Sequence, residues 1–324
     1  MVEKFRREAP PSDQPRPEDF GFDIDRTLES VVAIQAEIPE DGFTVSTLGA
    51  KRAGSGVVIG DNGLVLTIGY LVTEAENVWL TSAKGRLIPA HALAVDQESG
   101  FGLVQALDRS ALPALDRGRS SQARLGDPVI LAAGGRRQFL RANIVGMHEF
   151  VGYWEYLLKE AIFTAPAHPF WGGAGLIDSD GKLLGIGSLH IEQAMEQGRR
   201  CDINMIVPID LLTPVLADLL KFGRVDRPPR PWLGVYSTES DGKIIVAGLA
   251  EGGPAAVAGM RRGDMVCAVG DASVASLGDF YRQVWSCGPA GAEIPIEVER
   301  DELRVWLRIR STDRSGRLKK PRMH

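Results

Sequence analysis

Residues 169–185 read PFWGGAGLIDSDGKLLG. They begin with a glycine-rich turn and end in an apolar segment, KLLGIGSL, that continues to Leu189. Similar short apolar segments fill most of the chain from residue 54 onward, with Gly, Asp, Asn or Pro near most breaks. They recur roughly every 10–15 residues, which is typical of an all-β barrel or sandwich. Parallel βαβ units are excluded, because they need a helix between successive strands. The expected strands read GSGVVIG, GLVLTI, NVWLTSA, RLIPAHALAV, GLVQAL, DPVILAAG, ANIVGMHEF, AIFTA and KLLGIGSL.

The composition describes a globular chain. Its 324 residues suffice for about two domains. Hydrophobic residues make up 44% and charged residues 24%, which supports a buried core and excludes wholesale disorder. The net charge of −5 argues against a general nucleic-acid binder. The three cysteines are odd in number and too far apart for a zinc motif, so we expect no disulfide framework.

No stretch reaches the roughly 18 apolar residues that a membrane-spanning helix needs. The first twenty residues, MVEKFRREAPPSDQPRPEDF, carry charge but no apolar core, so they do not form a secretory signal. We therefore expect a cytoplasmic protein. The alternative is a periplasmic protein whose leader preceded this numbering and was removed.

Composition also predicts a domain boundary. Residues 223–230, GRVDRPPR, are rich in proline and charge and read as a linker. Before the linker, residues 27–222 form the β domain. This domain ends in an expected helix over 208–222, with Pro208 at its start and Gly223 just past its end.

After the linker, residues 231–312 form a smaller unit of short strands and two helical segments. Residues 1–26 are expected to form a flexible arm that could serve in oligomerisation, and residues 313–324 a basic, solvated tail. The expected strands of the smaller unit lie near 243–248, 265–269, 293–298 and 303–309, and its helices are Pro254–Ala258 and Leu277–Ser286.

Four stretches, in this order and at these separations, resemble the trypsin-like domain of the HtrA proteases. The later stretches PWLGV (231–235) and GGPAAVAGMRRGDMVCAVGD (252–271) resemble the PDZ domain that follows it in that family. The resemblance covers about residues 27–312 and implies a trypsin-like double β-barrel followed by a small α+β PDZ domain. The four stretches are GSGVVI with GLVLT (54–59 and 63–67), DPVILAAG (127–134), PFWGGAGLIDSDGKLLG (169–185) and NMIVP (204–208).

This resemblance also locates the family's catalytic positions. The histidine position falls in LTIGYLV and holds Tyr70, and the aspartate position falls before FGLV and holds Gly100. The serine position falls in HPFWGGAGL and holds Gly172. The trypsin-like mechanism needs a nucleophilic oxygen, an imidazole base and an orienting carboxylate. Since glycine offers no nucleophile and tyrosine is a poor base at neutral pH, we expect a pseudoprotease with no catalytic residues.

Two alternatives remain open. One is an active serine endopeptidase with an unrecognised catalytic arrangement, for which Ser188 and His190 stand two residues apart on one expected strand. The other is a ligand- or metal-binding module that reuses the old cleft. His190 with Glu192 and His148 with Glu149 supply only two ligands each, so we expect no metal site and no cofactor. The residues of this degenerate cleft are His168, Phe170, Trp171 and Gly173, beside Tyr70. The glycine-rich turn could still present backbone N–H groups, but we favour Trp171 as a plug in the cleft.

The PDZ-like unit predicts the binding function. PDZ domains hold a peptide's terminal carboxylate with backbone N–H groups and add the peptide as a strand. The resemblance implies that peptide C-termini, unfolded proteins or partner proteins bind here, in a scaffold, adaptor or chaperone-like role in protein quality control. For Phe280 and Val284, a place in the domain's core is an equal alternative. The expected peptide-binding residues are Trp232, Leu233, Gly234, Val235, Phe280, Tyr281 and Val284.

The segment before the first barrel carries a further expectation. HtrA-like proteases assemble as trimers through this segment, which implies a homotrimer in which Phe20 and Phe22 present one apolar face. The alternative is that both rings pack onto their own barrel. A mixed assembly with an active relative is a further expectation, and we expect no nucleic-acid partner and no membrane span.

Overall fold

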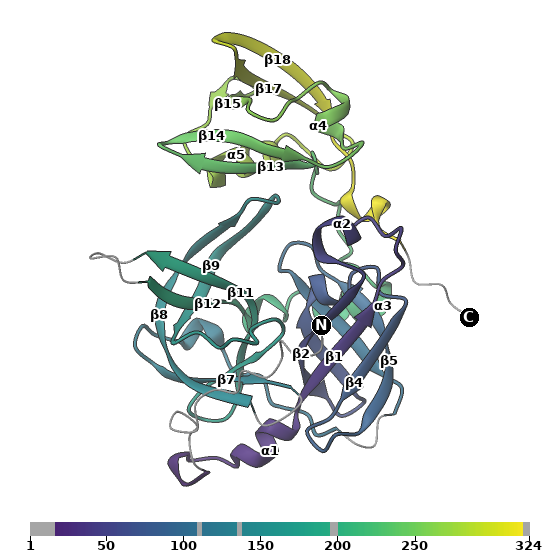
Figure 1. Ribbon diagram of the computed structural model, residues 1–324, viewed down its shortest axis with the longest axis vertical. Coiled ribbons are helices and arrows are strands. Elements are labelled where there is room, and N and C mark those ends of the chain that lie inside the picture. The colour runs from purple at the N-terminus through teal and green to yellow at the C-terminus, as the bar shows by residue number, and fades with distance from the viewer. Residues whose placement is uncertain (1–16, 109–111, 135–137, 195–199, 320–324) are drawn as a thin grey trace. The chain divides into compact units, whose positions relative to one another are not determined.

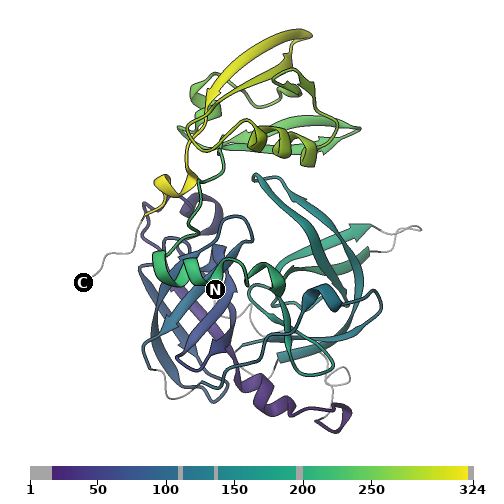
Figure 2. The same cartoon turned by 180° about the vertical axis from the view of Figure 1, so that it is seen from behind.

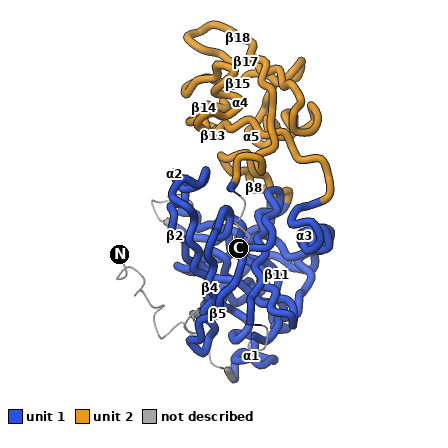
Figure 3. The backbone as a smooth tube through the Cα atoms, turned by 90° about the vertical axis from the view of Figure 1, so that its right-hand side faces the viewer, with its two compact units in different colours: residues 1–148, 160–225, 319–324 blue, residues 149–159, 226–318 orange. Residues whose placement is uncertain are grey.

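The computed structural model describes residues 17–108, 112–134, 138–194 and 200–319. The chain divides into two compact units (Figure 3). Unit 1 comprises residues 1–148, 160–225 and 319–324, and unit 2 comprises residues 149–159 and 226–318. Most of the predicted arm, residues 1–16, and the end of the predicted tail, residues 320–324, lie outside the described residues. The predicted domain boundaries stay a prediction.

Unit 1 contains two closed antiparallel barrels, which confirms the all-β prediction (Figure 1). The first closes in the order β1-β2-β3-β6-β5-β4 and the second in the order β10-β11-β12-β9-β8-β7. The strands of the first are β1 (Val31–Glu37), β2 (Lys51–Gly60), β3 (Leu64–Ile68), β4 (Asn77–Thr81), β5 (Leu87–Val95) and β6 (Phe101–Ala106). Those of the second are β7 (Pro128–Ala133), β8 (Gln138–Gly152), β9 (Tyr156–Ala165), β10 (Gly175–Ile177), β11 (Leu183–Ala194) and β12 (Arg200–Pro208).

Local sequence explains these strands. In β1 the buried Ile34 and Ala36 alternate with the exposed Gln35 and Glu37, as the two-residue period of a strand requires. Strand β3 is buried along its whole length, in keeping with its run of Leu, Val and Ile. Helix α1 (Ile24–Glu29) precedes β1 and is capped by Asp23, whose side chain accepts from the N–H of Arg26. A short helix α2 (Val45–Leu48) precedes β2.

The single helix expected over residues 208–222 is wrong. The chain forms a 3₁₀ turn at Ile209–Leu211, and helix α3 follows only at Leu216–Phe222. Pro214 lies between them, and a proline inside a helix removes a backbone N–H and clashes with the preceding turn. Helix α3 ends as predicted at Gly223, in the left-handed conformation, and lies beside β5 (Figure 2).

Unit 2 contains one antiparallel sheet in the order β13-β14-β15-β17-β18, with β16 paired to β15. Helix α5 (Leu277–Ser286) is capped by the preceding residue, Ser276, whose hydroxyl accepts from the N–H of Asp279. Its buried residues recur at the three- and four-residue spacing of one helix face and join the core of the sheet. The other elements are β13 (Val235–Ser240), β14 (Lys243–Leu249), α4 (Pro254–Val257), β15 (Met265–Val269), β16 (Ala272–Ser273), β17 (Glu293–Arg300) and β18 (Leu303–Arg310).

None of the described helices combines the length and apolar character that crossing a membrane would require.

A buried polar network in unit 1 fixes the segment after β3. The carboxylate of Glu74 accepts from the backbone N–H groups of Phe43, Thr44 and Lys319, at 2.8 to 2.9 Å, and from the hydroxyl of Thr44. Arg52 donates to that hydroxyl at 2.7 Å and to the carbonyl of Tyr70 at 2.6 Å. The network therefore holds the 3₁₀ turn Gly69–Leu71, which carries Tyr70.

We predict that Glu74→Gln lowers the free energy of unfolding by about 1–3 kcal/mol, because an amide nitrogen would face N–H groups that now meet a carboxylate. Burial alone would raise the pKa of Glu74, but the hydrogen bonds from Lys319, Thr44 and Phe43 outweigh it and hold that pKa below its usual range. The ionised carboxylate therefore stabilises the fold fully above the pKa of about 4.3 in the unfolded chain. This stabilisation is lost as the pH falls through the lowered pKa of the folded state.

Thermal unfolding of the full chain by calorimetry at several pH values measures the effect. Glu76→Gln is the matched control, because Glu76 is exposed two residues away. Equal losses in the two variants, or a Glu74→Gln loss that grows as the pH falls, would contradict the assignment.

Candidate functional site

The structure brings together two of the three positions that the resemblance assigns to catalytic residues, Tyr70 and Gly172. Tyr70 lies in the turn after β3, and Gly172 lies in the glycine-rich turn between β9 and β10. A Cβ atom on Gly172 would lie 2.9 Å from the phenolic oxygen of Tyr70. That oxygen donates to the carbonyl of Ser188 in β11 at 2.9 Å. The Tyr70 hydroxyl therefore occupies the space beside the position that a nucleophile would need.

Tyr70 stays a neutral phenol. Burial raises its pKa, and this outweighs the lowering effect of its side-chain hydrogen bond with Trp171. A phenol held in this form is a hydrogen-bond donor and a poor base at neutral pH. Its observed role is to join β11 to the turn after β3.

The third position, Gly100, adjoins the turn that carries Tyr70. Its carbonyl accepts from the N–H of Gly69 at 2.6 Å, and its backbone is left-handed, with φ at +84°. The carboxylate of nearby Asp96 accepts from the N–H and the hydroxyl of Ser99, at 3.1 and 2.6 Å. The nearby acid thus closes its own turn, and Gly100, at the position where the resemblance implies an orienting carboxylate, contributes a backbone carbonyl to the turn of Tyr70.

One of the two backbone donors that an oxyanion hole would use is also engaged. In the trypsin-like arrangement the hole uses the N–H of the nucleophile and that of the residue two before it, which here are Gly172 and Phe170. The Phe170 N–H donates to Nδ1 of His168 at 3.0 Å. His168 is buried, and its own N–H donates to the side-chain oxygen of Asn204 at 2.6 Å. His168 therefore acts as an acceptor that removes one donor from the hole.

Close packing fixes the glycine-rich turn. Gly173 has φ at +78°, and a Cβ there would lie 1.9 Å from the carbonyl oxygen of Ser55, so only glycine fits. The Ser55 N–H donates to the carbonyl of Gly172 at 2.8 Å. Trp171 is half-buried, with its ring 5.1 Å from that of His190. The plug expected from Trp171 stays a prediction.

The alternative arrangements gain little support. No hydrogen bond joins Ser188 to His190 among the described residues, and Nε2 of His190 lies 3.7 Å from a carboxylate oxygen of Asp202. Within the described part of the chain, no group of three or more His, Cys, Asp or Glu side chains could hold a metal ion.

In unit 2 the predicted carboxylate-binding loop holds a carboxylate of the same chain. The N–H groups of Leu233, Gly234 and Val235 donate to the side chain of Glu155, with shortest distances of 3.0, 2.7 and 2.9 Å. Burial raises the pKa of Glu155 to about 7, while the three N–H groups and the charge of Arg314 act to lower it. Trp232 lies outside this contact, because its N–H donates to the carbonyl of Thr312.

The remaining predicted peptide-binding residues lie in the interior. Phe280, Tyr281 and Val284 are at most 2% exposed and belong to the core of unit 2. Tyr281 still has its hydroxyl in use, because it donates to the carbonyl of Gly152 at 3.0 Å. No sequence signal marked Glu155, since the contact joins residues 78 to 80 positions apart.

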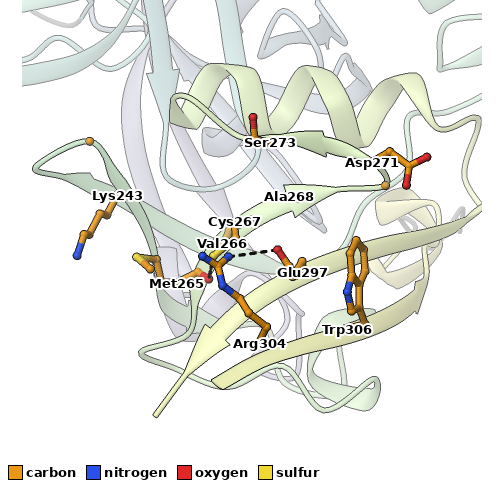
Figure 4. Close-up of a pocket in the computed structure, with 12 residues that line it drawn as sticks. Lys243, Met265, Val266, Cys267, Ala268, Asp271, Ser273, Glu297, Arg304 and Trp306 are labelled. Atoms are coloured by element: carbon orange, nitrogen blue, oxygen red, sulfur yellow. Dashed lines mark hydrogen bonds and ion pairs between the residues drawn. The ribbon is translucent and has the colours of Figure 1, made fainter. Parts of the chain in front are cut away.

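Unit 2 also has an open hollow of about 560 Å³ that shares no residue with the loop (Figure 4). Arg304 is paired with Glu297 at 3.2 Å beside it. Burial raises the pKa of the Cys267 thiol, so it lacks the thiolate character that reactive cysteines need. The hollow is lined by Gly242, Lys243, Met265, Val266, Cys267, Ala268, Gly270, Asp271, Ser273, Glu297, Arg304 and Trp306.

Comparisons with known proteins agree with this geometry. Residues 54–186 match the model of the trypsin-like peptidase domain, and residues 231–310 match that of the PDZ domain. The solved HtrA-type protease AlgW with decapeptide shares the fold, with a TM-score of 0.55 and 22% identity over 92% of this chain and 98% of that one. The chain therefore consists of a trypsin-like peptidase domain followed by a PDZ domain.

Sequence relatives name the family. The serine endoprotease DegS of Salmonella typhimurium is 23% identical over 311 residues, covering 90% of this chain and 85% of the relative. A probable periplasmic serine endoprotease DegP-like of Pseudomonas fluorescens is 25% identical over 271 residues, covering 78% of this chain and 54% of the relative. The chain is an HtrA-like protein with a C-terminal PDZ domain.

We predict that Gly172→Ser alone lowers the free energy of unfolding by about 1–3 kcal/mol, because the new side chain would meet the Tyr70 hydroxyl. In a Tyr70→His background the cost is expected to shrink, because the imidazole lacks that phenolic oxygen. A double-mutant cycle on urea unfolding curves measures the coupling, expected to be about 0.5–3 kcal/mol.

Gly21→Ser is the matched control, because a Cβ on Gly21 would meet nothing within 4 Å. Strictly additive losses for Gly172→Ser and Tyr70→His would show that the two positions do not interact.

Proposed function

We propose that this HtrA-like chain has no peptidase activity and binds the C-termini of peptides or partner proteins through its PDZ domain. The observation that carries the proposal is the Tyr70 hydroxyl, which lies beside Gly172. Gly172 is the residue that the resemblance assigns to the family's nucleophile position. The Phe170 N–H, which bonds His168, supports it further. Loss of a complete catalytic triad costs roughly a million-fold in turnover.

The PDZ half of the proposal rests on the loop Leu233–Val235. Its three N–H groups converge on one carboxylate, which is the chemistry that holds a peptide C-terminus. The barrels then serve as a scaffold for an adaptor or chaperone-like role.

Assembly and compartment also stay proposals. In the single chain, Phe22 packs against Gly181, and the guanidinium of Arg141 lies 5.0 Å from the Phe20 ring centroid. These contacts agree with packing onto the chain's own barrel, and the homotrimer and the mixed assembly with an active relative need light scattering in solution to test them. A relative named periplasmic favours the periplasmic alternative over the cytoplasmic expectation.

We predict that the purified chain neither cleaves casein nor reacts with a fluorophosphonate probe, with an active HtrA protease as the positive control. Cleavage or labelling that disappears in Ser188→Ala would contradict the proposal and favour an unrecognised catalytic arrangement.

A restored variant tests the role of the backbone. The triple change Tyr70→His, Gly100→Asp and Gly172→Ser supplies the missing side chains but leaves the Phe170 N–H bonded to His168. We expect casein cleavage at least about 100-fold slower than by the positive control, since loss of one oxyanion donor costs about 10²–10³ in kcat. Cleavage at a comparable rate would show that only the side chains were lost.

A further inference from the structure

The peptide groove of the PDZ domain already holds a segment of the same chain. Residues 149–159, the end of the β8–β9 hairpin, belong to unit 2 together with the PDZ domain (Figure 3). We propose that this hairpin end is an internal ligand of the groove, in which the Glu155 carboxylate takes the place of a peptide's terminal carboxylate. The inference rests on the proposed peptide-binding function and adds its regulation, because an external C-terminus must displace the hairpin.

The carboxylate contact has the geometry of terminal-carboxylate capture. One oxygen of Glu155 accepts from the N–H groups of Gly234 and Val235, and the other accepts from that of Leu233. Three consecutive backbone donors on one carboxylate form the kind of nest that binds anions. Glu155 lies inside the chain and has no terminal carboxylate, so its side-chain carboxylate takes the place of the terminal carboxylate of a free peptide.

The backbone of the hairpin continues the match along β13. The Ser237 N–H donates to the carbonyl of Tyr153 at 3.0 Å, two residues before Glu155. Val235 and Ser237 are also two residues apart, as expected when alternate residues of a strand face an added strand. The spacing from the carboxylate to the next backbone contact is therefore that of a peptide added to the edge of the sheet.

Helix α5 contacts the same segment. The hydroxyl of Tyr281 donates to the carbonyl of Gly152 at 3.0 Å and accepts from the N–H of Glu155 at 3.3 Å. Arg282 forms an ion pair with Glu149, and Val151 packs against the core of unit 2. The segment thus contacts β13 and α5, the two elements that border a PDZ groove.

The backbone of Glu155 is adapted to this placement. Its φ is +60°, in the left-handed region that residues other than glycine seldom adopt. Residues in such conformations need surrounding contacts to hold them. Here the contacts are the three N–H groups of the loop and the hydroxyl of Tyr281.

The competing external ligand follows from these contacts. It is an extended peptide with a free terminal carboxylate, whose carbonyl two residues before the end accepts from Ser237. If the hairpin end leaves the groove free for only a fraction of the time, the apparent dissociation constant of an external peptide equals its intrinsic value divided by that fraction. Removing the Glu155 carboxylate should therefore tighten the binding of a peptide that carries its own.

The test uses the full chain and a labelled probe, FVGYWL, which repeats residues 150–154 and places a terminal carboxylate on the residue that replaces Glu155. Fluorescence anisotropy compares the wild type with Glu155→Ala, and we expect tighter binding to the variant by on the order of tenfold or more. Glu155→Gln, which keeps the side-chain size, should tighten binding less. Amidation of the probe should abolish the gain in both variants.

Glu160→Ala is the matched control. It removes an exposed carboxylate five residues further along the same hairpin and should bind the probe as the wild type does. The rate of amide hydrogen exchange at residues 233–237, measured by mass spectrometry, reports whether the hairpin end protects the loop when no external ligand is present. We expect faster exchange in Glu155→Ala and unchanged exchange in Glu160→Ala.

The outcomes separate the inference from the proposed function. Equal probe affinity in the wild type and Glu155→Ala, with unchanged exchange at residues 233–237, would overturn the inference and leave peptide binding intact. Faster exchange in Glu155→Ala without probe binding by any variant would support the internal ligand and count against peptide capture by the PDZ domain.

Discussion

A backbone N–H that is removed from water needs an acceptor, and in both functional turns of this chain the acceptor belongs to the chain itself. In the peptidase domain the Phe170 N–H meets a ring nitrogen of His168. In the PDZ domain the N–H groups of Leu233, Gly234 and Val235 meet Glu155. These four N–H groups are therefore engaged within the chain before any ligand arrives.

The two turns differ in how firmly their donors are engaged. His168 is buried and hydrogen-bonded to Asn204, and its ring nitrogen accepts from the N–H of Phe170, two residues further along the chain. Freeing the Phe170 N–H would therefore require the turn to be rebuilt. Around it, the Tyr70 hydroxyl and the guanidinium of Arg52 bind backbone carbonyls and stabilise a closed arrangement. Glu155, by contrast, reaches its donors from a hairpin end, which could leave as one piece. Under the proposed function, the fold opposes chemistry in the peptidase domain, whereas the hairpin end only competes with binding in the PDZ domain.

Sequence reasoning succeeded where the signal is local. The short apolar segments and the glycine breaks between them predicted most strands, and the helix expected at Leu277–Ser286 has the bounds of α5. Tyr70 and Gly172 could be singled out because they lie in short motifs, and the structure places them beside each other. Their assignment to catalytic positions stays a prediction. Pro214 is the local feature that breaks the helix expected over residues 208–222.

Other features depend on contacts or side-chain orientations that a sequence pattern does not encode. Strand β10 spans only three residues directly after a glycine-rich turn, and the second half of β13 is polar and exposed, so neither has a strong strand signal. The pairing of Phe170 with His168 depends on a side-chain orientation. Glu155 stands in an ordinary hairpin sequence, and its role appears only when the fold brings it to a loop about 80 residues away.

A tethered ligand is present at an effective concentration, which for short flexible tethers is on the order of millimolar. A hairpin end joined to two strands of the same chain does not diffuse away after it leaves the groove. External C-termini must therefore compete with the hairpin end, whose effective concentration is fixed by its tether. C-termini that are present at low concentration or that bind weakly would fail to displace it. The hairpin thus sets a threshold on the abundance and affinity of the partners that this chain can engage.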